Sequence, residues 1–312
     1  MKLKVLFVRS GNKGQHPITQ NQGESMSEVG CDVVYFDVLG KGVLGYLNNL
    51  SNLRERVKTF NPDVIHAHYS LCGFLVALGF FGKPVVVSLM GSDVLSTRFI
   101  HRLLIKLCRR FFWNLILVKS DEMYNQLGDN KALVIPNGVN KKDFHPGSKS
   151  EARRLLGWNE ESRIVLFGSD PKRAEKNYPL FRETFEQLRK MGIDAEERCL
   201  LNLNKHTMNL YYNACDVLLL TSIHEGSPNV VKEAMFCNCP FVSVDVGDVS
   251  HWVTCTEGNK VVDANAVALS KAVYDTLQAK CAPVNDKAKE VLDAVLISER
   301  LKLAYLEIIS AK

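Results

Sequence analysis

The chain has 312 residues, 46% of them hydrophobic and 23% charged, which is typical of a globular protein long enough for two domains with separate cores. Its net charge of +5 suits an anionic substrate or an anionic membrane surface and is too weak to indicate a nucleic-acid-binding protein. The nine cysteines include no Cys-x-x-Cys pair, which indicates reduced thiols in a cytoplasmic protein rather than a metal clip.

Apolar runs alternate with helical patterns along the first half of the chain. The pattern predicts strands at residues 3–8, 32–36, 64–67, 85–89, 115–118 and 133–135, with helices between them, for example at 50–60 and 71–80. Such alternation predicts a doubly wound parallel sheet, whose functional loops follow the carboxyl ends of the strands. No apolar run in the sequence reaches the ~18 residues that a membrane span requires.

The first of these loops, residues 10–15, holds Gly11 and Gly14. Glycines let a backbone approach a ligand closely, so both are candidates for ligand contact. The G-x-G-x-x-G spacing of a dinucleotide fingerprint is absent, and a mobile turn is the alternative.

Two histidines, His66 and His68, lie at the end of the third predicted strand. Side chains two residues apart on a strand share a face, so both rings are expected to point the same way. Metal binding would need further ligands, which the sequence does not offer there. Asp93, in the Gly-Ser-Asp turn after the next strand, is a further candidate for a binding cleft.

Residues 98–113 predict an amphipathic helix with an unusual basic face. One face holds apolar residues suited to the domain core, namely Ile100, Leu103, Leu104, Leu107 and Phe111. The other face carries cations with large apolar residues among or beside them, namely Arg98, Arg102, Lys106 and Arg109 with Ile105, Phe112 and Trp113. This mixed face predicts docking on an anionic membrane surface, and an ordinary basic helix covered by the neighbouring chain is the alternative.

The alternation resumes from about residue 148 in the second half of the chain. Strands are predicted at 164–167, 197–201, 217–220 and 241–244, and the final helices at 264–277 and 298–309. The loop after the first of these strands contains Lys172, Arg173 and Lys176. Cations at the carboxyl end of a parallel strand can neutralise a diphosphate, so the loop is a candidate diphosphate site. The alternative interpretation is a basic loop that is solvated and binds nothing.

A helix opens after the third of these strands, in the stretch EGSPNVVKEAM at residues 225–235. Ser227 suits the N-cap and Pro228 the first helical position, and the open N–H groups of such a terminus can hold a phosphate or diphosphate. Glu225 and Glu233 bracket this anion site, and carboxylates accept hydrogen bonds from sugar and ribose hydroxyls. The segment therefore predicts phosphate held between sugars, and a capped core helix with two solvated glutamates is the alternative.

Glu225 and Glu233 are separated by seven residues, and the segment runs from a strand through a loop into a helix. This arrangement resembles the retaining GT-B glycosyltransferase family that includes sucrose synthases and bacterial mannosyltransferases. Four further segments resemble the same family: IPNGVNKKDFHP at 135–146, VLFGSDPKRAEKN at 165–177, VIHAHYS at 64–70 and VSLMGSDV at 87–94. The resemblance covers nearly the whole chain. It implies an α/β GT-B fold, in which two Rossmann-like doubly wound parallel-sheet domains face a central cleft.

The resemblance also implies how the chain is divided. An N-terminal acceptor-side domain is expected at residues 1–147 and a C-terminal nucleotide-sugar-binding domain at 148–297, with the helix at 298–312 packing back on the first. Apolar residues suit that helix for this contact: Leu301, Leu303, Tyr305, Leu306 and Ile309.

Residue roles follow from the same resemblance. Glu233 is expected to hold the ribose hydroxyls, and catalytic roles fall to Glu225 at the donor sugar, His68 near the transferred sugar, and Asp93. Donor contacts, chiefly with the phosphates, are expected from Arg173, Lys176, Gly226, Ser227, Pro228, Asn229, Gly11 and Gly14. Met90 and Ser169 depart from the family pattern, which usually places His and Arg there.

We therefore expect retaining hexosyl transfer from a nucleoside diphosphate sugar to an acceptor hydroxyl, in cell-surface glycan or polysaccharide synthesis. No Asp-x-Asp pair is present to hold a cation, so no metal or other cofactor is expected. Expected partners are the donor, a lipid-linked glycan acceptor and an anionic membrane surface through residues 98–113, but not nucleic acid. This places the protein in the cytoplasm, with the inner face of the membrane as its docking surface. A GT-B nucleotide-sugar epimerase and a non-catalytic nucleotide- or nucleic-acid-binding protein are the alternatives.

Overall fold

The computed structural model describes residues 2–12, 17–95, 99–254, 258–279 and 285–311, and the chain divides into two compact units. Unit 1 comprises Met1–Gly138 and Ala294–Lys312, and unit 2 comprises Val139–Asp293. The boundary after Gly138 precedes the one predicted at residue 147, and the returning segment joins unit 1 four residues before the helix predicted at 298. The seven cysteines that the structure describes are free.

Unit 1 is built on a parallel sheet with the strand order β2-β1-β3-β4-β5-β6. The strands are β1 (Leu3–Ser10), β2 (Cys31–Val38), β3 (Val64–His68), β4 (Val85–Ser88), β5 (Leu115–Val118) and β6 (Leu133–Val134). Residues of β3, β4 and β5 are buried throughout, as expected for strands covered on both faces. The six predicted strands are confirmed to within two residues at each end.

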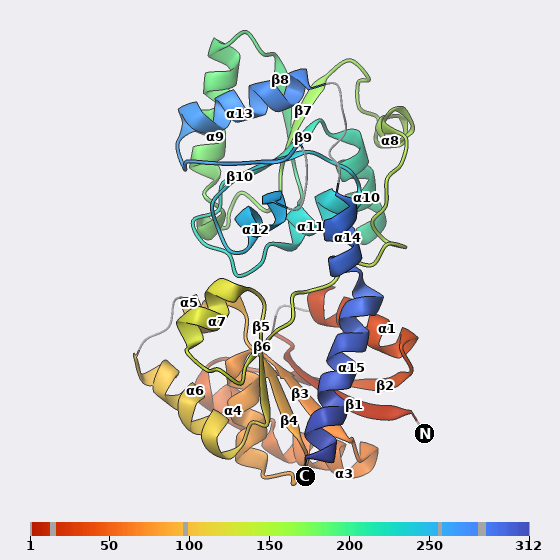
Figure 1. Ribbon diagram of the computed structural model, residues 1–312, viewed down its shortest axis with the longest axis vertical. Coiled ribbons are helices and arrows are strands. Elements are labelled where there is room, and N and C mark those ends of the chain that lie inside the picture. Colours follow the sequence, from red (N-terminus) through yellow and green to blue (C-terminus); the bar gives the residue numbers. More distant parts are fainter. Residues whose placement is uncertain (1, 13–16, 96–98, 255–257, 280–284, 312) are drawn as a thin grey trace. The chain divides into compact units, whose positions relative to one another are not determined.

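Helices cover both faces of the unit 1 sheet. They are α1 (Pro17–Glu28), α2 (Gly42–Leu47), α3 (Leu50–Phe60), α4 (Ser70–Gly79), α5 (Gly91–Leu95), α6 (Phe99–Phe111), α7 (Asp121–Leu127) and α15 (Ala294–Ser310). Because side chains alternate along a strand, Val5 and Phe7 join a core with α1 and α15, while Leu6 and Val8 join the core beneath α3, α4, α6 and α7. Figure 1 shows α15 beside α1.

The last helix packs on unit 1 through a narrower face than the sequence predicts. Leu301 and Tyr305 are fully buried, together with Ile297. Leu303 and Leu306 are exposed, so their prediction as packing residues is wrong. The reason is the helical period, because residues 297, 301 and 305 share one face and residues 303 and 306 turn away from it.

Unit 2 repeats the arrangement with the parallel strand order β11-β10-β9-β7-β8. The strands are β7 (Arg163–Phe167), β8 (Ala195–Cys199), β9 (Val217–Leu220), β10 (Phe241–Val244) and β11 (Lys260–Val262). The strand predicted at 197–201 is displaced by two residues, because the edge strand β8, AEERC, is polar and partly exposed and lacks the continuous apolar run of a central strand.

The elements that cover this second sheet are α8 (Lys149–Leu156), the 3₁₀ helix η1 (Ala174–Lys176), α9 (Tyr178–Lys190), α10 (Lys205–Ala214), α11 (Asn229–Phe236), α12 (Val249–Thr254), α13 (Ala266–Gln278) and α14 (Asp286–Leu292). Helices α9 and α13 cover one face, and α10, α11 and α14 cover the other (Figure 1). Val165 and Phe167 of β7 belong to the first core, and Ile164 and Leu166 to the second. The loops after β7, β9 and β10 therefore leave the same edge of one rigidly packed sheet.

Candidate functional site

The central loop of this edge joins β9 to α11. All four residues of β9 are buried, and the chain stays buried through Ser222 before it becomes accessible at Ile223. Pro228 is the N-cap of α11, with φ −70° and ψ 115°, and no side chain caps the helix. The predicted N-cap role of Ser227 is therefore wrong. Its hydroxyl is engaged elsewhere, since it donates to Asp248 Oδ2 at 2.6 Å and accepts from Lys232 Nζ.

An ion pair links this loop to the loop after β7. Lys176 Nζ contacts Glu225 Oε1, which also accepts a hydrogen bond from Ser222 Oγ at 2.8 Å. Lys176 is only 9% exposed, and Thr221 Oγ1 donates to its carbonyl oxygen at 3.1 Å. The ion pair and the Thr221 hydrogen bond tie the two loops together and place Lys176 and Glu225, two of the predicted site residues, side by side.

A second ion pair holds the loop from the other side. Lys232 is fully buried on α11, and its Nζ lies 3.7 Å from Asp248 Oδ2 in the loop after β10. Burial lowers the pKa of Lys232, and Asp248 opposes that shift. Gly247 has a φ of +58°, and a Cβ there would lie 3.1 Å from the Gly226 carbonyl oxygen, so only glycine lets the two loops approach this closely. The backbone ahead of α11 is therefore held from both sides.

Glu233 lies in the second turn of α11 and stays partly accessible. The Tyr212 hydroxyl donates to its Oε2 at 2.8 Å. Burial raises the pKa of Glu233 to about 7, and the Tyr212 hydrogen bond and the charges of Lys205 and Lys232 oppose the rise. The carboxyl group therefore changes charge near neutral pH.

The remaining predicted site residues of unit 2 differ in their exposure to solvent. Arg173 has a side chain 54% exposed and pairs with Glu175 at 2.7 Å, so its charge lies largely in solvent. Gly226 and Asn229 are partly accessible and Pro228 is buried, at the start of α11. Of the two cations predicted for a diphosphate, Lys176 is the one built into the site.

In unit 1, His68 ends β3 and is 3% exposed. Its ring stacks on His66 with centroids 4.2 Å apart, which confirms that the two side chains share a face. His66 Nδ1 lies 2.5 Å from the Tyr305 hydroxyl and Nε2 lies 2.8 Å from Ser88 Oγ. Burial lowers the pKa of His66 well below its usual range, with help from His68 and Lys119, so His66 is a neutral core residue.

Asp93 is 1% exposed and accepts hydrogen bonds within unit 1. Its carboxylate accepts from the Ser70 hydroxyl, from the Ser70 N–H at 3.2 Å and from the Met90 N–H at 2.7 Å. Burial raises its pKa to about 6, against these hydrogen bonds. Asp93 thereby ties the start of α5 to the start of α4.

The glycine-rich loop of unit 1 is described only at its beginning. A Cβ on Gly11 would lie 2.8 Å from Leu39 Cδ2, so this glycine is needed for contact with the chain after β2. Gly14 lies outside the described residues.

Three contributors to the unit 2 site were missed by the sequence reasoning: Ser222, Tyr212 and Lys232. Tyr212 is 21 residues from Glu233, and only the packing of α10 beside α11 reveals their contact. The burial of Lys232 could not be expected from its residue type, because a single lysine in an apolar helix usually faces solvent. Among the described residues, no group of three or more His, Cys, Asp or Glu is placed to hold a metal ion.

Comparison with known proteins gives matches along most of the chain. The family model described as Glycosyltransferase Family 4 matches residues 7–143, and the one described as Glycosyl transferases group 1 matches residues 151–279. A Bacillus subtilis relative, TuaC, carries the provisional name of a teichuronic acid biosynthesis glycosyltransferase and is 26% identical over 236 residues. That match covers 68% of this chain and 60% of TuaC, so the chain spans less than two thirds of this relative. The trehalose synthase of Pyrococcus horikoshii is 29% identical over 154 residues, 48% of this chain and 36% of that protein.

Solved structures resemble the whole chain. Sucrose-phosphate synthase from Thermosynechococcus elongatus has a TM-score of 0.75 at 17% identity and covers 100% of both chains. HepE of Anabaena, solved in complex with UDP and glucose, also has a TM-score of 0.75 at 17% identity, covering 98% of this chain and 100% of HepE. At such identities the likeness shows the fold alone.

Proposed function

Because the chain belongs to the GT-B glycosyltransferases, with a glycosyltransferase family 4 domain followed by a glycosyl transferases group 1 domain, we propose that it transfers a hexosyl group with retention of configuration. The donor is a nucleoside diphosphate sugar, and the acceptor supplies a hydroxyl. The observation that carries this proposal is the contact between Lys176 and Glu225 at the sheet edge where α11 begins. A buried cation, a carboxylate and a helix N-terminus together match a diphosphate joined to a sugar.

The unit 2 side chains divide the donor among them in this proposal. Glu233 accepts hydrogen bonds from the ribose hydroxyls, and Glu225 accepts from the sugar hydroxyls. Lys176 and the N–H groups of residues 226, 227 and 229 hold the diphosphate, with Arg173 at the solvent side. Lys232 acts as a positioning residue, because it holds the backbone that offers those N–H groups.

The chemical step needs little from acid or base side chains. The acceptor oxygen attacks the anomeric carbon on the face from which the diphosphate leaves, and the bond from that carbon to the diphosphate oxygen breaks. A donor phosphate oxygen takes the acceptor proton, so the products are the glycoside and the nucleoside diphosphate. Lys176 and the helix N-terminus stabilise the charge that develops on the leaving group. His68 is assigned to the transferred sugar, and Asp93 acts through Ser70 on the loop that follows His68.

The relatives suggest which donor and which product to test first. HepE was solved with UDP and with UDP-glucose, which makes UDP-hexoses the first donors to try. The name of TuaC supports a role in the synthesis of a cell-surface polysaccharide, and a lipid-linked glycan is a suitable acceptor for such a pathway.

We expect turnover without a divalent metal. The diphosphate is offered Lys176 and a helix N-terminus, which supply the charge neutralisation that a metal ion would otherwise provide. Activity should persist, within about twofold, in excess EDTA. Complete loss in EDTA, with recovery on addition of magnesium or manganese, would contradict the assignment.

A donor screen distinguishes the candidate functions. The protein is incubated with UDP-, GDP- and ADP-hexoses, with and without a candidate acceptor, and the free nucleoside diphosphate is measured. A glycosyltransferase releases it and forms a glycoside whose anomeric configuration matches the donor. An epimerase changes the donor without an acceptor, and a binding protein consumes none, so either outcome would refute the proposal.

A further inference from the structure

Helix α6 presents an apolar stripe to solvent. The stripe consists of Ile100, Leu103, Leu104, Leu107 and Phe111, whose side chains are between 43% and 70% exposed. The sequence predicted this face for the domain core, and that prediction is wrong. Ile105 and Trp113, which the sequence placed among the cations, are each 2% exposed and occupy the core instead.

Trp113 explains why the helix is turned this way. Its ring stacks on Phe74 with centroids 5.4 Å apart, and its Nε1 donates to the Gly73 carbonyl oxygen at 3.1 Å. A Cβ on Gly73 would lie 2.8 Å from the Trp113 ring, so glycine allows the close approach to α4. With Trp113 and Ile105 fixed against the core, helical spacing forces the stripe outward.

Aromatic residues extend the stripe beyond the end of α6. Phe112 and Phe80 are both exposed, and their rings meet edge to face with centroids 5.3 Å apart. Contiguous exposed apolar residues of this size mark interaction surfaces rather than ordinary protein surface.

Cations border the stripe, and α6 contains no acidic residue. Lys106 and Arg110 are exposed along one side of it. Arg109 turns back toward the protein, where it pairs with Asp129 at 3.0 Å and donates to the Trp113 carbonyl oxygen at 2.9 Å. The bordering charge is therefore positive along the exposed edge.

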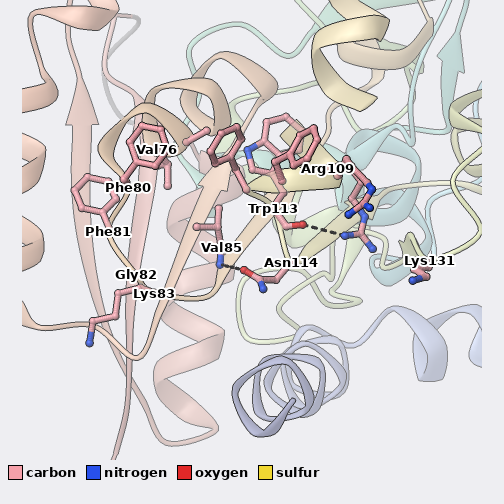
Figure 2. Close-up of a pocket in the computed structure, with 14 residues that line it drawn as sticks. Val76, Phe80, Phe81, Gly82, Lys83, Val85, Arg109, Trp113, Asn114 and Lys131 are labelled. Carbon is pink, nitrogen blue, oxygen red and sulfur yellow. Dashed lines mark hydrogen bonds between the residues drawn. The ribbon is translucent and has the colours of Figure 1, made fainter. Parts of the chain in front are cut away.

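A basic hollow of about 690 Å³ lies at the carboxyl end of α6. Figure 2 shows Lys83 and Phe80 toward one end of it and Arg109 and Lys131 toward the other, with Trp113 between. Arg110 also lines this hollow. A neighbouring hollow of about 620 Å³ is lined by the same three cations, Arg109, Arg110 and Lys131. The cations of this hollow suit the phosphate of a lipid headgroup, and the aromatic rings beside them suit its acyl chains.

We propose that α6 docks on an anionic phospholipid bilayer. The stripe and the Phe80 and Phe112 rings enter the boundary between headgroups and acyl chains, and Lys106, Arg110 and Lys131 contact lipid phosphates. Within the described ranges, none of the helices combines the length and apolar composition that a bilayer span requires. Docking through a single helix face is consistent with that observation.

The charges favour this occupant over a second copy of the chain. In a twofold dimer the same patch lies on both sides of the interface. The basic edge of α6 would then meet another helix without an acidic residue, whereas an anionic bilayer supplies the opposite charge.

Vesicle co-sedimentation of the full chain tests the proposal, independently of whether the protein transfers a sugar. Wild type should sediment with equimolar phosphatidylcholine and phosphatidylglycerol vesicles at low salt, less at high salt, and not with phosphatidylcholine alone. Leu104→Ser with Leu107→Ser should weaken binding roughly thirtyfold, through lost apolar burial. Lys106→Ser with Arg110→Ser should weaken it to a similar degree, also roughly thirtyfold.

Matched controls separate the surface from general effects. Leu303→Ser with Leu306→Ser changes two leucines that are 60% and 45% exposed on α15, and Arg56→Ser with Lys58→Ser removes two exposed cations of α3. Both controls should bind as wild type, and circular dichroism should show unchanged melting for all four variants.

Three outcomes would overturn the proposal. Wild type could remain in the supernatant with the anionic vesicles at low salt. The α6 variants could bind no more weakly than their controls. Light scattering could show a wild-type dimer that the leucine variant of α6 converts to monomer, which would make the stripe a contact between copies.

Discussion

Replacing Lys176 by methionine is expected to lower the rate of sugar transfer by about 10²–10³-fold, the usual effect of removing one group that stabilises transition-state charge. Lys176 is the cation that the structure holds beside Glu225 and almost out of solvent. Because bulk water screens it little, its interaction with a departing diphosphate is strong. Methionine keeps most of the side-chain volume, so the loss reports charge rather than packing. Steady-state kinetics with the donor found in the screen give kcat and KM.

Lys172→Met is the matched control for this prediction. Lys172 carries the same charge in the same loop but is exposed. Its replacement should change the rate by no more than about twofold, since exposed charges are weakly coupled to a nearby site. If the Lys176 and Lys172 variants turned over at similar rates, Lys176 would have no special role in the reaction.

Replacing Lys232 by methionine is expected to destabilise unit 2 by roughly 3–5 kcal/mol, as when one partner of a buried ion pair is removed. Lys232 is fully buried, and Asp248 would be left with its Ser227 hydrogen bond but no cation. Urea unfolding followed by tryptophan fluorescence, to which Trp158 and Trp252 of unit 2 contribute along with Trp113 of unit 1, measures the change in the free energy of unfolding.

A double-mutant cycle gives the control. Asp248→Asn alone leaves the lysine charge buried without its partner, so it should also destabilise the protein. The double variant removes both charges and should be more stable than the sum of the two single effects predicts. Strict additivity would show that Lys232 and Asp248 do not interact.

The sheets could be predicted because parallel strands covered on both faces are continuous apolar runs. The runs at 115–118, 217–220 and 241–244 match β5, β9 and β10 residue for residue. The predicted bounds were displaced at the edge strand β8, because Glu196, Glu197 and Arg198 interrupt its apolar run. The resemblance that the Glu225 to Glu233 spacing carries is confirmed by the two family matches.

Orientation and long-range contacts could not be predicted. The amphipathic pattern of α6 shows two faces, but only the Trp113 contact with Gly73 decides which of them is buried. The hydroxyl of Ser227 suits an N-cap by residue type, yet it bonds to Asp248 from the loop after β10 and to Lys232 of α11. Such contacts depend on packing, which a single sequence does not contain.

Calorimetric titration of UDP, GDP and ADP, interpreted through Glu233, tests whether unit 2 binds the nucleotide of a sugar donor. The pKa of Glu233 is raised to about 7, so its carboxylate is present above that pH and is lost as the pH falls through it. Only the carboxylate accepts hydrogen bonds from both ribose hydroxyls. Affinity should therefore fall roughly tenfold between about pH 8 and about pH 6.

Glu233→Gln should weaken nucleotide binding by about 1.5–3 kcal/mol at about pH 8. It should also remove the part of the pH dependence that the nucleotide's own phosphate ionisation does not explain. If the Glu233→Gln variant bound UDP, GDP and ADP as wild type does, or if wild type bound none of them, the donor site assigned to unit 2 would be wrong.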